Sequence, residues 1–182
     1  MVICFLIHTV CPVSALSAGE SRILCARVFG PETGAGNFTP EQRRLMQKEK
    51  LHVVARPVRS AVAQSREASG GLCVEAVGVF SLGNAELFPE RSLVLWLEVQ
   101  SLAFTLLCRP HENLLLAKGV LRNIAPHCLE ELRLLGPGAE VLLKSDRVDA
   151  LLHRLLPHGQ LLFLNHRFDL TLDKEIASYM SK

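Results

Sequence analysis

The sequence predicts an α+β protein in which helices flank a five-stranded antiparallel sheet. Three observations lead to this prediction: five short apolar runs bounded by turn residues, one capped helical pattern between the second and third runs, and helical spacing after residue 113. The resulting order, β-β-α-β-β-β-α-α-α, has connections short enough for antiparallel neighbours. The chain has 182 residues, of which 49% are hydrophobic, so we expect residues 1–182 to form a single domain around one core.

The first two strands are expected at the N-terminus. The runs from Val2 to Val10 and from Arg22 to Phe29 are rich in β-branched and aliphatic residues, and each ends at a proline-containing stop. Both have the length of a strand. Small and polar residues between 14 and 21 favour a hairpin, so the two strands are expected to pair.

A helix is predicted to follow residue 39. Thr39 at the N-cap, Pro40 at N1 and Gln42 at N3 form a capping box, which satisfies backbone amides at the start of a helix. Helical apolar spacing continues until Ser69 and the two glycines after it. Pro57 lies inside this pattern, and we expect it to kink or interrupt the helix because proline lacks a backbone donor.

The most apolar stretch of the chain, residues 93–119, follows a third strand predicted from Val74 to Leu82. One alternative is a transmembrane helix, which needs about 20 apolar residues with few or no charges. The apolar part, residues 93–108, is too short and contains Glu98, which disfavours this alternative. Leu93 to Val99 and Leu102 to Cys108 are instead predicted to be the fourth and fifth strands.

Three helices are predicted after Asn113. The first places six apolar residues on one face: Ala117, Leu121, Ile124, Cys128, Leu132 and Leu135. Pro126 predicts a bend or break in it. The second begins at Ser145 or Asp146 and ends at Pro157 and Gly159. The third carries apolar residues at intervals of four: Phe168, Leu172, Ile176 and Met180.

Charge and cysteine content limit the functional classes. The net charge of +2 is spread along the chain, which predicts neither a nucleic-acid nor a membrane surface. Arg43, Arg44, Lys48 and Lys50 cluster, but acidic residues lie among them, and a solvated helix face is favoured.

The six cysteines have no C-x-x-C spacing, which favours a reduced, cytosolic protein. Residues 1–19 imitate a secretory signal, with Asn37 in a glycosylation sequon, so secretion stays an alternative.

The sequence nominates no catalytic, cofactor-binding or metal-binding residue. Cysteine and histidine are both present, so a Cys/His hydrolase is conceivable, but nothing places a pair together. An enzyme is therefore not expected. The apolar content is larger than the predicted helix stripes need, notably at residues 114–116, 142–143 and 161–164. Burial in the core and contact with a partner explain this surplus equally well.

Two segments carry a resemblance to a known family. The run from His111 to Ala117, continued by Gly119, and the run from Leu156 to Asn165 resemble the sigma, or small, subunit of the fifth adaptor-protein complex. Residues 5–9 and 28–30 are similar to it as well. The likeness extends from the first strand to the last helix and is weakest at residues 30–39 and 67–92. The connection over residues 67–92 is shorter than is usual in the family.

The resemblance implies a longin-like fold and a non-enzymatic role in vesicle traffic at late endosomes and lysosomes. It implies packing against the N-terminal trunk of a large zeta subunit, with beta and mu subunits completing the complex. Spatacsin and spastizin are implied as further partners, and membrane contact is implied only through the assembly. No cargo-binding motif can be matched, so no cargo-binding residue is assigned.

A second hypothesis comes from a different class: a self-standing longin-type regulatory module that binds a peptide or a small GTPase along a sheet edge. It predicts a stable monomer, whereas an adaptor subunit requires its partner.

Overall fold

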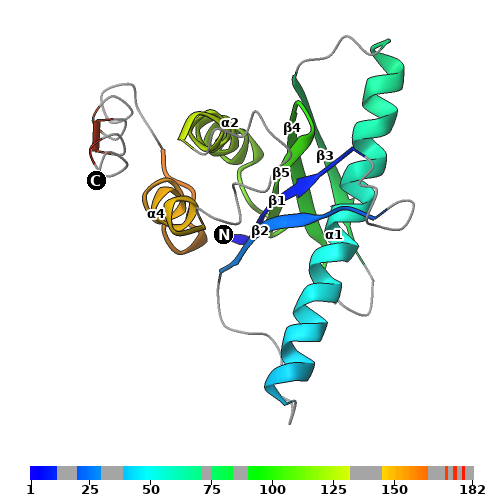
Figure 1. The fold of residues 1–182 in the computed structure, drawn as a ribbon, viewed down its shortest axis with the longest axis horizontal. Helices are drawn as coiled ribbons and strands as arrows, with labels where there is room; N and C mark the ends of the chain where they lie inside the picture. Colours follow the sequence, from blue (N-terminus) through cyan, green and yellow to red (C-terminus); the bar gives the residue numbers. More distant parts are fainter. Residues whose placement is uncertain are drawn as a thin grey trace.

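The computed structural model describes residues 1–11, 20–29, 39–70, 75–83, 90–131 and 145–163, together with residues 171, 174, 175 and 178. It has an α+β, longin-like fold (Figure 1). The elements in chain order are β1 (Val2–Thr9), β2 (Ile23–Val28), α1 (Pro40–Ala68), β3 (Glu75–Leu82), β4 (Ser92–Val99), β5 (Leu102–Cys108), α2 (Leu114–Glu131), α4 (Ser145–Leu155) and the short 3₁₀ helix η1 (Pro157–Gly159). All five predicted strands are confirmed, with small changes at their ends.

The five strands form one sheet in the order β2-β1-β5-β4-β3, and every neighbouring pair is antiparallel. The predicted pairing of the first two strands is confirmed. β5 is the central strand, and its neighbour β1 lies far from it in the sequence. β4 and β5 are joined by a tight turn at Gln100 and Ser101, where Gln100 has a φ of 60°. The apolar stretch of residues 93–119 thus forms a β-hairpin followed by the start of α2.

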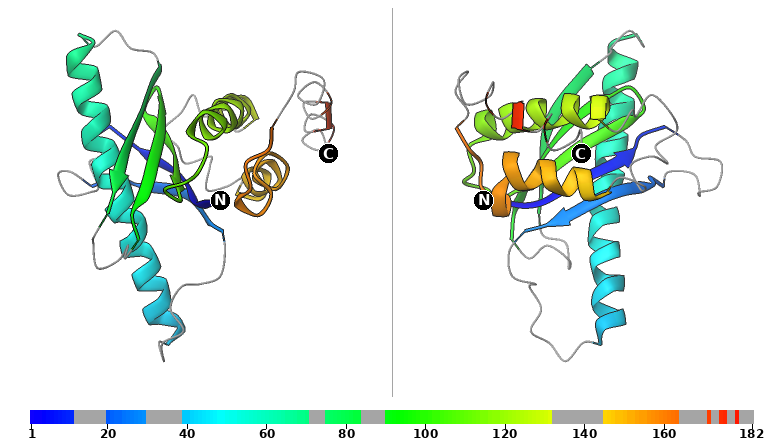
Figure 2. Two further views of the ribbon diagram at one scale, coloured as in Figure 1. Left: turned by 180° about the vertical axis from the view of Figure 1, so that it is seen from behind. Right: turned by 60° about the vertical axis from the view of Figure 1, so that its left-hand side comes forward.

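The helices lie in two layers on opposite faces of the sheet. α1 covers one face, while α2 and α4 cover the other (Figures 1 and 2). Each layer has its own cluster of buried side chains: Val54, Val58 and Val62 of α1 pack over one face, and Leu121 and Ile124 of α2 belong to the cluster on the other. Because alternate strand residues point to opposite faces, strands buried on both sides read as nearly continuous apolar runs.

Neither internal proline interrupts its helix. α1 continues from Pro40 to Ala68 through Pro57, and α2 continues through Pro126. The interruption expected as one outcome at Pro57, and the break expected as one outcome at Pro126, do not occur; a kink or bend at these prolines stays a prediction. A proline removes one backbone hydrogen bond, whereas tertiary packing of an apolar face supplies most of a helix's stability. Val54 and Val58, on either side of Pro57, are both buried against the sheet. The capping box of Thr39 and Gln42 is confirmed.

Gly78 on the edge strand β3 makes room for the only tryptophan of the chain. Gly78 pairs with Trp96 across β3 and β4, and a Cβ at Gly78 would lie 2.5 Å from Trp96 Cζ2. Glycine in a strand commonly marks such a close approach. The indole is therefore buried between the edge strand and the layer of α1.

Several predictions fall outside the described residues. They are the positions of Leu132 and Leu135 and the apolar stripe of the final helix: Phe168, Leu172, Ile176 and Met180. Residues 171, 174, 175 and 178 are helical and exposed. No helix within the described ranges is long and apolar enough to cross a membrane.

Candidate functional site

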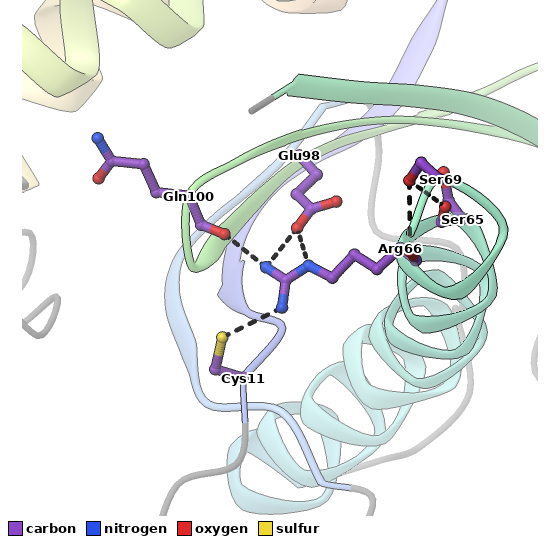
Figure 3. A network of polar contacts seen from close by, with 6 residues as sticks. All are labelled: Cys11, Ser65, Arg66, Ser69, Glu98 and Gln100. Atoms are coloured by element: carbon purple, nitrogen blue, oxygen red, sulfur yellow. Dashed lines mark hydrogen bonds and ion pairs between the residues drawn. The ribbon is translucent and has the colours of Figure 1, made fainter. Parts of the chain in front are cut away.

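Arg66 joins three parts of the fold at one end of the sheet. Its guanidinium forms an ion pair with Glu98 of β4, and it donates hydrogen bonds to the backbone oxygen of Gln100 at 2.6 Å and to Cys11 Sγ at 3.5 Å (Figure 3). Arg66 comes from the last turns of α1, Gln100 from the β4–β5 turn and Cys11 from the chain just after β1. The polar contacts of Arg66 therefore link the last turns of α1 to the sheet.

Glu98 explains why this contact is needed. It is 2% exposed, it lies in an otherwise apolar strand, and its Oε2 has no hydrogen-bond partner among the described residues. A buried carboxylate without a cation is strongly unfavourable. Arg66 supplies that cation while its own side chain stays partly exposed. The lone acidic residue within an apolar run was visible in the sequence, but its partner, 32 residues earlier, was not.

His8 is a second buried polar residue on the α1 side of the sheet. Its Nε2 is 3.3 Å from Thr105 Oγ1, and its Nδ1 is 3.3 Å from the backbone oxygen of Thr9. Burial lowers the pKa of His8 to about 4, although the contact with Thr9 opposes this shift. The imidazole is therefore neutral in the folded protein at physiological pH.

This depressed pKa predicts that the protein loses stability in mild acid. Between pH 6.5 and pH 4 the unfolded chain takes up a proton at His8 that the folded protein does not, so folding becomes less favourable as the pH falls. We expect His8 to account for a loss of about 2 kcal/mol between pH 7 and pH 5. Urea unfolding of the wild type and of His8→Gln, which keeps a polar group facing Thr105, measures it: the variant should lose less stability over this interval. Parallel pH profiles would contradict the assignment.

The cysteines do not supply an activated nucleophile at the buried positions. Burial raises the pKa of Cys4 to about 12 and those of Cys25 and Cys108 to about 11, and it also raises the pKa of Cys128. Nucleophilic attack requires the thiolate, so these groups are inert at neutral pH. Cys4, Cys11, Cys25, Cys108 and Cys128 are free thiols, and Cys73 lies outside the described residues. Within the described ranges, no three His, Cys, Asp or Glu side chains are grouped to hold a metal ion.

The apolar surplus of the sequence is divided between core and surface. Leu161 packs against the α2 and α4 core, whereas Leu115 is 83% exposed and Phe163 is 84% exposed. Residues 142, 143 and 164 lie outside the described ranges. The segment that carries Phe163 passes beside α2 in both the first view and the turned view (Figures 1 and 2). The apolar pattern of the sequence could not separate Leu115 and Phe163 from their half-buried neighbours.

The two segments that hold these residues have defined structural roles. Asn113 caps α2, because its Oδ1 accepts hydrogen bonds from the backbone N–H groups of Leu115 and Leu116 at 3.1 and 3.2 Å. Gly159 has a φ of +76°, and a Cβ there would lie 2.6 Å from the Val2 oxygen. Asn113 and Gly159 thus fix the starts of the chain segments that present Leu115 and Phe163.

Comparison with known proteins gives consistent matches. A family model described as AP-5 complex subunit sigma-1 matches residues 1–177. AP-5 complex subunit sigma-1 of Homo sapiens is 39% identical over 196 aligned residues, which cover 98% of each chain. The protein of the same name from Mus musculus is 37% identical over 155 residues, covering 75% of this chain and 91% of the mouse protein. Because the match to the family model and to the human protein runs along nearly the whole chain, and the fold is longin-like, the chain belongs to the family of the sigma-1 subunit of the AP-5 adaptor complex.

Proposed function

We propose that this chain, as one domain of residues 1–182, is the non-catalytic small subunit of a heterotetrameric adaptor. It packs on the N-terminal trunk of a large zeta subunit, and beta and mu subunits complete the complex. The assembly acts in vesicle-mediated sorting at late endosomes and lysosomes, with spatacsin and spastizin as further partners. Membrane contact is made by the assembly.

Two exposed apolar side chains support a specific contact surface for this subunit. Leu115 and Phe163 have the largest exposed fractions among the exposed large hydrophobic residues of the described chain. Contiguous exposed apolar patches mark interaction surfaces, and we take Leu115 and Phe163 to be parts of such a patch. Leu115 belongs to α2, and the segment that carries Phe163 follows η1 on the α2 and α4 side of the sheet (Figures 1 and 2); both residues belong to the segments that resemble the small-subunit family. We assign the contact with the large subunit to this surface, which we name the apolar docking surface.

The test is co-expression of this chain with the trunk of the zeta subunit. The wild-type chain should be retained by the tagged trunk, and Leu115→Ser and Phe163→Ser should each reduce retention at least tenfold, because truncating a buried interface anchor costs about 2 kcal/mol or more. Leu45→Ser is the matched control, since Leu45 is also exposed, at 59%, but belongs to α1 in the opposite layer. Thermal melts should be alike for all the chains.

The outcomes separate the two levels of the proposal. A well-behaved wild-type monomer that ignores the trunk contradicts the adaptor role and favours the self-standing longin module. Retention of the wild type and of both serine variants at the same level preserves the adaptor role but removes the apolar docking surface.

A further inference from the structure

Ser69 has an arginine at a spacing that serine kinases recognise. The segment reads Arg66-Glu67-Ala68-Ser69, which places the arginine three residues before the serine. Across the whole sequence, no other serine or threonine has an arginine or lysine at that spacing. Kinases select their substrates partly by charges at fixed distances from the reacting hydroxyl group. Ser69 is therefore distinguished from the other hydroxyl side chains of the chain by its sequence alone.

Ser69 also lies where a kinase can reach it, at the C-terminal end of α1. It is the C-cap residue, and residues 67–70 are all exposed. Among the described residues, nothing lies within 4 Å of a virtual Cβ at Gly70, which follows it. The last buried residue of α1 is Val62, so the final turns carry no fully buried side chain. A helix end with few buried contacts opens locally at little cost in free energy, and a kinase needs such opening to bind the chain in an extended form.

The hydroxyl group of Ser69 takes part in ending the helix. Its O–H donates to the backbone oxygen of Ser65 at 2.7 Å, and the backbone oxygen of Arg66 lies 3.3 Å away (Figure 3). A phosphate ester has no proton on this oxygen, so phosphorylation removes the donor. The C-terminus of a helix carries a partial negative charge, which repels a phosphate group placed there. Phosphorylation of Ser69 is therefore expected to loosen the last turn of α1.

Arg66 connects this helix end to the sheet and faces the same competition. Its guanidinium pairs with Glu98 and donates a hydrogen bond to the backbone oxygen of Gln100. Side chains three residues apart are neighbours on a helix surface, so a phosphate on Ser69 is within reach of Arg66. A phosphate carries more negative charge than a carboxylate and is a strong acceptor for arginine. The phosphate therefore competes with Glu98 for one guanidinium.

We propose that Ser69 is a phosphorylation site of an arginine-directed serine kinase, and that the phosphate releases the end of α1 from the sheet. In the reaction, Ser69 Oγ bonds to the γ-phosphorus of ATP, the bond from that phosphorus to the β–γ bridging oxygen breaks, and ADP leaves. The hydroxyl proton passes to a carboxylate of the kinase. Both steps concern this chain alone, so they hold or fail independently of the adaptor role.

The test is phosphorylation of the purified full chain, with Mg²⁺ and ATP, by a serine kinase that requires arginine three residues before its target. We expect one phosphate per chain, which peptide mass spectrometry places on Ser69. Ser69→Ala should reduce incorporation roughly tenfold or more. Ser60→Ala is the matched control and should leave incorporation unchanged. Ser60 is another exposed serine of α1, but Pro57 occupies the position three residues before it.

Two variants test the part played by Arg66. Glu98→Gln keeps the size of the side chain but removes the charge that holds Arg66, so the initial rate should rise roughly threefold or more. Arg66→Met also frees the helix end, but it removes the charge that the kinase recognises, so the rate should fall roughly tenfold or more. A rate in Arg66→Met that equals or exceeds that of the wild type shows that access alone controls the reaction and overturns the proposal.

Hydrogen exchange measures the consequence for the fold. Backbone amides of residues 63–69 should exchange roughly fivefold faster in the phosphorylated chain, while those of β4 and β5 keep their rates. Phosphatase treatment should restore the original exchange. Unchanged exchange at the helix end overturns the release of α1 from the sheet. Phosphate found on other residues, with Ser69 unmodified, overturns the site itself.

Discussion

Replacing Arg66 with methionine is expected to lower the free energy of unfolding by about 3 kcal/mol. The change leaves Glu98, which is 2% exposed, as a buried carboxylate without its cation. It also removes the hydrogen bonds that hold the chain just after β1 and the β4–β5 turn to α1. Part of the Arg66 side chain is exposed, which places the expected loss at the lower end of the range for a broken buried pair. Urea unfolding at pH 7 measures it.

A double-mutant cycle separates the ion pair from simple loss of packing. Glu98→Leu combined with Arg66→Met removes both charges, and the double variant should recover most of the loss, because apolar residues of similar volume replace a buried pair at little cost. Arg56→Met, an exposed change on the same helix, should stay within about 0.5 kcal/mol of the wild type. A loss below about 1 kcal/mol in Arg66→Met would show that Glu98 is solvated when unpaired.

The second large effect is expected at Gly159. Gly159→Ala should cost about 3 kcal/mol, since the position has a φ of +76° and a new Cβ would lie 2.6 Å from the Val2 oxygen and 2.7 Å from Phe29 Cβ. Neither neighbour is the flexible end of a side chain. The segment that presents Phe163 would have to move away from β1, so retention by the zeta trunk should fall together with stability.

Two other glycines serve as controls for this substitution. Gly70 also has a positive φ, +65°, but nothing lies within 4 Å of its virtual Cβ, so Gly70→Ala should show only the backbone cost of about 1 kcal/mol. Gly119 lies inside α2, again with nothing within 4 Å, and Gly119→Ala should stabilise by roughly 0.5–1 kcal/mol. If Gly159→Ala and Gly70→Ala lower the free energy of unfolding equally, the contact with Val2 does not add to the cost at position 159. Thermal or urea unfolding of the three variants measures these changes in stability and ranks them.

Local signals in the sequence predicted most of the fold. Turn residues bounded all five strands, and the capping box at Thr39 placed the start of α1 correctly. Neither Pro57 nor Pro126 interrupts its helix, because the proline rule is local while the packing that holds each helix together is not. The family was predicted from two segments, and the comparisons confirmed it.

The candidate site was much less visible in the sequence. Leu115 and Phe163 are chemically no different from their neighbours, and only their exposure sets them apart. Glu98 was noticed as an interruption, but Arg66 was one of many basic residues until the fold placed it beside that carboxylate. The sequence shows which basic residues cluster in α1, but it does not show which way their side chains point. That direction depends on which residues of the helix are buried against the sheet.

The sequence by itself determined which segments are strands, where α1 starts and the family, because these depend on propensities, caps and residue patterns within short windows. The tertiary structure alone decided the strand order β2-β1-β5-β4-β3, the partner of Glu98, the crowding at Gly159 and the exposure of Leu115 and Phe163. These are contacts between residues far apart in the chain, or directions fixed by such contacts. The physical reason is that burial and pairing free energies are set by neighbours that a short window of sequence does not contain.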